Sequence, residues 1–136
     1  MTRPILLAYQ TLIGLADTLT GSLLVISPEF TLRLMGLQVP SDALPYIEFI
    51  GAFVLSVGLA CMYGALVMVR RGSPCTLETV WLLTALTRAG VAVLVATQIL
   101  EQTLEPGWLT VAISDGACVL IQAIGLRKGW LGNVAR

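Results

Sequence analysis

A long apolar segment with one arginine near its middle constrains this chain more than any other feature. The segment runs from Leu77 to Leu100 and contains Arg88. At about 1.5 Å per residue, a helix of this length extends roughly 36 Å, which is enough to cross a bilayer. A charged side chain at that depth costs about 2.5–3.5 kcal/mol on insertion scales. We therefore expect Arg88 to have an anionic partner inside the membrane.

Three further segments are apolar and long enough to span a membrane, so the chain is expected to have four spans, at about residues 5–26, 46–69, 77–100 and 108–126. Charged residues make up only 12% of the chain, against about 25% in soluble domains. We expect the first span to be a retained helix and not a signal peptide, because Asp17 interrupts its apolar run. The predicted fold class is all-α, an integral membrane four-helix bundle, with residues 1–136 forming one membrane domain.

The connection between the first two spans has its own helical pattern. Pro28 suits the first position of a helix and Gly36 suits a stop. We predict a short helix over 28–35 that lies on the outer surface, with Phe30 and Leu34 facing the bundle or lipid. A cap over the bundle is favoured over a ligand lid.

Basic residues are concentrated on one side of the predicted spans. The single basic residue on the opposite side is Arg33, and the loop from Glu101 to Gly107 has acids and no base. By the positive-inside rule, both termini face the cytoplasm and this loop lies outside. Trp81 and Trp130 are predicted to belong to an aromatic belt near the inner surface. The basic residues assigned to the inner side are Arg3, Arg70, Arg71, Arg127, Lys128 and Arg136.

Two aspartates lie at nearly the same depth as the arginine. Asp17 in the first span and Asp115 in the fourth are each within one helical turn of Arg88. Because a guanidinium has five donors, it can hold both carboxylates, and we predict an Asp17–Arg88–Asp115 cluster. Fully ionised, it carries one excess negative charge, which a proton on one aspartate or a bound cation would remove. Glu48 is a fourth candidate about 14 Å nearer the outer surface, either solvated or reached by a long side chain from below.

Other polar residues share helix faces with this cluster. The supporting polar residues are Gln10, Thr84 and Gln122. An ion-pair network that fixes helix register is the favoured interpretation. A ligand, proton or ion pathway is the second, and contact with charges on a partner subunit is the third.

Several classes of site and partner are not expected. The chain has no histidine, and its three cysteines form no CxxC pair, so no metal site is predicted. Its formal net charge is zero, which argues against nucleic acid as a partner. No cofactor can be assigned from the sequence.

A resemblance to a known group is carried by four stretches along the chain. These stretches are SPEFTLRLMGL in the first connection, IEFIGAFVLSVGLACMYG in the second span, TRAG in the third and ISDG in the fourth. The chain resembles the small four-helix bacterial membrane proteins grouped around the DoxX-like families. The resemblance implies the architecture and a bacterial cytoplasmic (inner) membrane location. DoxX itself is associated with a thiosulfate:quinone oxidoreductase, but this activity is not carried over.

The leading functional hypothesis is a non-catalytic four-span protein. It would be an accessory or structural subunit of a larger membrane complex, or a self-associating bundle, surrounded by lipid. The alternative is a small binding or transport module whose buried Asp–Arg–Asp cluster holds the polar head of a lipid-like or quinone-like molecule. An enzyme is the least favoured hypothesis, because carboxylates alone are a common constellation.

Overall fold

The computed structural model describes residues 2–132, and within this range it is helical without any strand. The four long helices are α1 (Arg3–Ile26), α3 (Leu44–Val69), α4 (Pro74–Leu100) and α5 (Leu109–Arg127). The short elements are α2 (Pro28–Leu34) and two single 3₁₀ turns, η1 (Ser41–Ala43) and η2 (Pro106–Trp108). The all-α prediction is confirmed. The second and third spans begin two and three residues earlier than predicted, because Pro45 and Pro74 fit into first helical turns.

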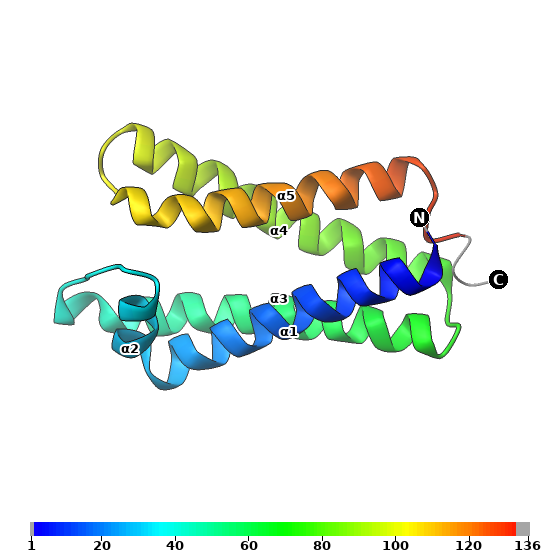
Figure 1. The fold of residues 1–136 in the computed structure, drawn as a ribbon, viewed down its shortest axis with the longest axis horizontal. Helices are drawn as coiled ribbons and strands as arrows, with labels where there is room; N and C mark the ends of the chain where they lie inside the picture. The colour runs from blue at the N-terminus through cyan, green and yellow to red at the C-terminus, as the bar shows by residue number, and fades with distance from the viewer. Residues whose placement is uncertain (1, 133–136) are drawn as a thin grey trace.

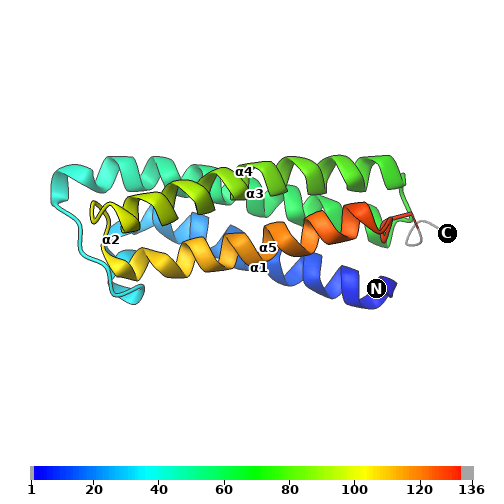
Figure 2. The ribbon, with the colours of Figure 1, turned by 90° about the horizontal axis from the view of Figure 1, so that it is seen from above.

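The long helices run side by side as two pairs. Helices α1 and α3 form one pair and α4 and α5 form the other, as Figure 1 shows in two layers. Seen from above, α4 lies over α3 and α5 lies over α1 (Figure 2). The α1–α3 pair and the α4–α5 pair therefore enclose the four inward faces on which the sequence places its polar residues.

Glycines bring the backbones of α1 and α3 into direct contact. A Cβ atom added at Gly21 would lie 2.6 Å from the Leu55 Cα and 2.8 Å from the Gly51 carbonyl oxygen. A Cβ at Gly58 would lie 2.5 Å from the Thr18 amide nitrogen. Small residues allow this approach in helices that cannot use water to drive association.

Two apolar clusters occupy the ends of the molecule. The cluster at the end where α1 begins is formed by Leu6, Met68, Leu77, Trp81 and Leu131. The cluster at the opposite end is formed by Leu24, Leu32, Leu37 and Ile47, with Trp108 packed against it. The inward polar residues lie between the two clusters.

The outward faces of the long helices are apolar. Side chains such as Leu19 (63% exposed), Leu86 (62%) and Leu120 (65%) point away from the protein. A soluble monomer rarely exposes such continuous apolar surface. All four helices are also long and apolar enough to cross a membrane, which indicates an integral membrane protein in contact with lipid.

Helix α2 forms where the sequence predicts it. Thr31 and Leu32 face the bundle, whereas Phe30 and Leu34 point away from it, with 53% and 67% of their surfaces exposed. The helix ends at Leu34, and two residues later Gly36 has a φ of 72°, the left-handed conformation that glycine adopts without strain. Of the two predicted orientations for Phe30 and Leu34, the one facing away from the bundle is observed.

The prediction for Trp81 is wrong. Its side chain is 0% exposed and belongs to an apolar cluster instead of a lipid-facing belt. The reason is that the indole N–H has a buried acceptor on α1, so the ring can be fully enclosed.

Basic residues do gather at one end of the described chain. The start of α1, which begins at Arg3, the connection 70–73 and the end of α5 lie at one end of the molecule, where Figure 1 marks the N-terminus. Arg136, which the sequence assigns to the same side, lies outside the described residues, as does Met1.

Candidate functional site

The centre of the molecule holds the predicted charge cluster. Arg88 on α4 donates through Nη2 to Asp17 Oδ2 on α1 and through Nη1 to Asp115 Oδ1 on α5. Both contacts are ion pairs, and the Arg88 side chain is only 6% exposed. The structure therefore brings together the three residues that the sequence placed at one depth.

The positions of the two aspartates follow from how their helices pack. Asp17 lies where α1 touches α3, since a Cβ at Gly58 would be 2.9 Å from the Asp17 carbonyl carbon. Asp115 lies one turn from the buried Cys118 and two turns from the buried Gln122, on the same face of α5. Arg88 thus connects the α1–α3 pair to the α4–α5 pair.

The arginine is more deeply enclosed than its partners. The Asp17 and Asp115 side chains retain 20% and 15% exposure. Among residues 2–132, Asp17 Oδ1 and Asp115 Oδ2 accept no hydrogen bond. With both carboxylates ionised, the cluster would carry one excess negative charge in a medium of low dielectric constant.

A second group of polar residues lies toward the α1 N-terminus. Gln10 donates from Nε2 to the Cys61 carbonyl oxygen at 3.0 Å and accepts at Oε1 from Trp81 Nε1 at 2.8 Å. Gln122 donates from Nε2 to Thr84 Oγ1 at 2.9 Å. The three supporting polar residues predicted from the sequence are all buried and all hydrogen-bonded.

Glu48 does not join the cluster. Its side chain is exposed near the start of α3. It precedes Gly58, which lies at the level of Asp17, by ten residues, or about 15 Å along the helix. That separation is too large for Arg88 to bridge while it also holds the two aspartates. The interpretation of Glu48 as a cluster member is wrong.

Two aromatic residues, Tyr9 and Trp81, belong to the polar core, although neither was predicted as a site residue. Tyr9 packs edge-on against Trp81, with ring centroids 5.9 Å apart. Trp81 shares a helix face with Thr84 and Arg88, and this spacing indicates an inward ring, in conflict with its assignment to the aromatic belt. Tyr9 is adjacent in sequence to Gln10, and no periodic pattern singles it out.

Within the described residues, no three His, Cys, Asp or Glu side chains lie close enough to hold an ion. Cys61 and Cys118 are buried free thiols, and Cys75 is an exposed one.

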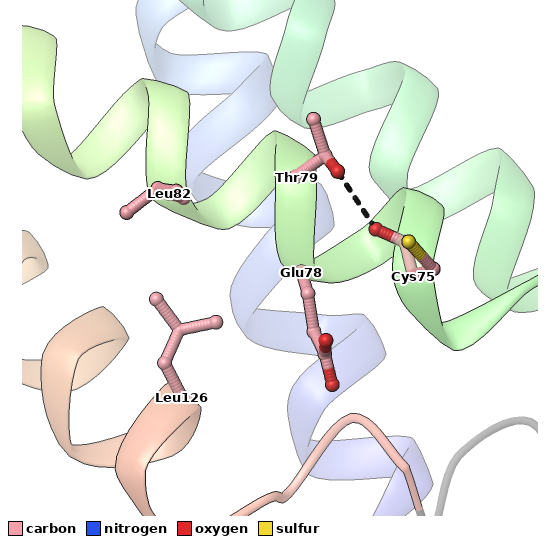
Figure 3. Close-up of a pocket in the computed structure, with 5 residues that line it drawn as sticks. All are labelled: Cys75, Glu78, Thr79, Leu82 and Leu126. Atoms are coloured by element: carbon pink, nitrogen blue, oxygen red, sulfur yellow. Dashed lines mark hydrogen bonds between the residues drawn. The ribbon is translucent and has the colours of Figure 1, made fainter.

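Two surface pockets lie away from the charge cluster. One is a groove between α4 and α5, lined by Cys75, Glu78, Thr79, Leu82 and Leu126 (Figure 3). The Thr79 hydroxyl donates to the Cys75 carbonyl oxygen at 2.9 Å, so that hydroxyl is already used within the helix. The other pocket lies beside α2, between Glu29 and Leu44. Neither pocket is lined by Asp17, Arg88 or Asp115.

This arrangement is suited to holding helices together. A guanidinium that binds two carboxylates neutralises one of their two negative charges and fixes three helices at one register. It does not present a nucleophile beside a base, or two carboxyl groups with separate environments.

Compared with known proteins, the chain matches no family model, no curated protein and no solved structure. The resemblance to the DoxX-like families therefore stays a prediction.

Proposed function

We propose that this chain is a non-catalytic membrane protein that acts as an accessory or structural subunit of a larger membrane assembly, or that associates with copies of itself. The observation that carries the proposal is the pairing of three charged residues at the centre of the molecule. Arg88 holds both Asp17 and Asp115, between apolar clusters at either end.

The connections between helices support a role within the membrane. The connection from α3 to α4 covers residues 70–73, and that from α4 to η2 covers residues 101–105. The longest one contains α2, whose inner side packs on the bundle. These connections are too short to form a catalytic domain outside the membrane.

Two glycines of the α4–α5 pair have open space beside them. A Cβ added at Gly90 or at Gly116 would have no neighbour within 4 Å among the described residues. The glycines of α1 and α3, by contrast, are covered by each other's helices. Small residues on a lipid-facing surface allow another helix to approach closely, which supports association through α4 and α5.

Cross-linking in native membranes, followed by native mass spectrometry in a mild detergent, tests this proposal. We expect a complex larger than one chain, and we expect Gly90→Leu to reduce it while Gly90→Ala leaves it largely intact. Both variants should keep the thermal stability of the parent chain, because the site is open within one chain. A single chain without any cross-linked partner would contradict the proposal.

We further propose that the end carrying Arg3 and Arg127 faces the cytoplasm of a bacterial cell, in its cytoplasmic membrane. The grouping of basic residues at that end supports this orientation. A cysteine introduced at Gln102, in a chain whose native cysteines are replaced, should react with a membrane-impermeant thiol reagent in intact spheroplasts. Reaction only after the inner surface is exposed would reverse the orientation.

One observation favours the alternative, a binding module for a lipid-like or quinone-like molecule. The carboxylates of Asp17 and Asp115 keep part of their surface exposed. If they hold a polar head, a short-chain quinone should raise the melting temperature of the parent but not of Asp17→Asn. If the quinone does not change the melting temperature of the parent chain, the binding role is contradicted, and the cluster serves to hold the helices together.

A further inference from the structure

The groove between α4 and α5 lies at the end of the molecule where α1 begins. Its volume is about 380 Å³, within the range of about 300–1,000 Å³ that is typical of ligand sites. Glu78 and Leu82 line it from α4, and Leu126 points from α5 toward them (Figure 3). Leu82 is 51% exposed, so the groove is open toward the surrounding lipid. A lipid molecule can therefore enter it sideways from the bilayer.

The polarity of the groove changes with depth in the same direction as that of a phospholipid. Counted from Arg88 at the centre of the molecule, Leu82 lies about 9 Å along α4 and Glu78 lies about 15 Å along it. Half of the hydrocarbon core of a bilayer is also about 15 Å thick. Leu82 is thus at the level of acyl chains, and the Glu78 carboxylate is at their boundary with the head groups.

Two basic side chains follow the groove at the end of α5. Arg127 and Lys128 come directly after Leu126, and both are exposed. Arg127 lies about 18 Å along α5 from Asp115, the partner of Arg88, which puts it in the head-group layer. Arginine and lysine are the side chains that bind phosphate groups most strongly. The groove therefore has two cations just beyond the level of the carboxylate that lines it.

These three charges are not paired with one another or with other charges in the described chain. Among residues 2–132, no ion pair involves Glu78, Arg127 or Lys128. Arg3, at the same end of the molecule, donates instead to the Met68 carbonyl oxygen at 2.9 Å. A head group that has both a cation and an anion is complementary to a carboxylate beside two bases.

We propose that this groove binds one phospholipid whose head group carries a phosphate and a primary ammonium, as phosphatidylethanolamine does. The ammonium donates to the Glu78 carboxylate, and Arg127 and Lys128 bind the phosphate. One acyl chain lies against Leu82 and Leu126. The site is separate from the central charge cluster, and it does not depend on whether the chain associates with partners.

Two other lipid head groups are less complementary to the groove. The quaternary ammonium of phosphatidylcholine has no N–H to donate and is typically bound by aromatic rings, but no aromatic side chain of the described residues lines the groove. The head group of phosphatidylglycerol has no cation to pair with Glu78. The carboxylate therefore determines which lipid is preferred.

Native mass spectrometry of the full chain, with equal amounts of these three lipids carrying identical acyl chains, tests the proposal. We expect about two- to fivefold more bound phosphatidylethanolamine than phosphatidylcholine, the preference that an exposed charge pair supplies. Glu78→Gln should remove this preference, whereas Glu101→Gln, exposed at the other end of α4, should keep it. Equal binding of the lipids by the parent, stronger binding of phosphatidylglycerol, or an unchanged preference in Glu78→Gln would overturn the proposal.

The role of the two bases is tested in the same experiment. Arg127→Gln combined with Lys128→Gln should lower the binding of all three lipids several-fold and leave their order unchanged, because all three carry the phosphate. Undiminished binding by this variant would contradict the assignment of the phosphate to α5.

A second pair of variants tests whether the lipid occupies the groove itself. Leu82→Trp fills the groove from α4, and Leu83→Trp makes the same change at an exposed neighbour that does not line it. We expect the first variant to lose phosphatidylethanolamine binding several-fold and the second to retain it, with the helical circular dichroism of the parent in both. Equal binding by the two variants would place the lipid elsewhere and would overturn the proposal.

Discussion

The two ways in which helices meet in this protein depend on different physical terms. Where α1 meets α3, glycines such as Gly21 and Gly58 bring backbone against backbone. Where the α1–α3 pair meets the α4–α5 pair, long polar side chains span the distance, and Arg88 and Gln10 make the connections. The first interface depends on the absence of side chains, and the second depends on their presence.

This difference determines which substitutions each interface tolerates. A close backbone contact has no atom that can move aside, so added volume is the threat to the α1–α3 interface. The polar junction can accommodate some movement of flexible side chains, but it fails when one partner of a buried pair is removed and the other is stranded. Substitutions that remove a partner or add volume can separate the two mechanisms.

The largest effect is expected from Arg88→Leu, which leaves Asp17 and Asp115 facing each other without a counter-charge. Breaking a buried ion pair from one side costs about 3–5 kcal/mol. Adding Asp17→Asn and Asp115→Asn to this variant should restore much of the loss, because no stranded charge remains. Thermal unfolding in detergent of the single and triple variants measures the difference. Equal stability of Arg88→Leu and the parent would show that the ion pairs do not hold the two pairs together.

The next largest effect is expected from Gly21→Leu, which places a side chain against the α3 backbone at Leu55. Overpacking typically costs about 1–3 kcal/mol, and here the atoms in the way are backbone. Gly90→Leu is the matched control, because it makes the same change on an open surface and gains helix propensity. We expect Gly21→Leu to lower the melting temperature and Gly90→Leu not to lower it. If the two variants behave alike, close packing is not what distinguishes α1 and α3.

A smaller loss is expected from Gln10→Met, which keeps the side-chain length but removes both hydrogen bonds. The Trp81 N–H and the Cys61 carbonyl would remain buried without their partner. Each stranded group costs about 1–3 kcal/mol when it stays dry, and movement of the flexible indole should keep the total near the low end. Gln38→Met, at an exposed position, serves as the control in the same unfolding assay. An unchanged midpoint would mean that this bond adds nothing to the polar junction.

The coarse architecture could be predicted from the sequence because hydrophobic length and proline position are local signals. The four spans, the short helix after Pro28 and the common depth of Asp17, Arg88 and Asp115 all depend on rise per residue.

The partners across helices could not be predicted in the same way. Trp81 and Tyr9 enter the polar core because of which helices are neighbours, and neighbourhood is a tertiary property. Glu48 was included as a candidate for the charge cluster because its depth alone could not exclude contact with a long side chain that extends toward it from the middle of the membrane. The tryptophan was assigned to the lipid interface because an aromatic residue near a span's end has two physically reasonable positions.

The smallest effect is expected from breaking the exposed Arg33–Glu29 ion pair on α2. This pair has the same chemistry as the central ion pairs of Arg88 but is not buried. Arg33 donates to Glu29 one turn earlier, and their side chains are 73% and 65% exposed. Exposed pairs at this spacing contribute about 0.3–0.5 kcal/mol, because water solvates each charge when the other is removed. Glu29→Gln should therefore shift the melting temperature by about 1 °C or less, several-fold less than Arg88→Leu. Raising the salt concentration should erase even this difference, whereas the loss in Arg88→Leu should persist, since buried pairs are screened much less. If Glu29→Gln proved as damaging as Arg88→Leu, the stability of this protein would depend on its charges irrespective of their position, and the distinction between the central junction and the rest of the molecule would fail.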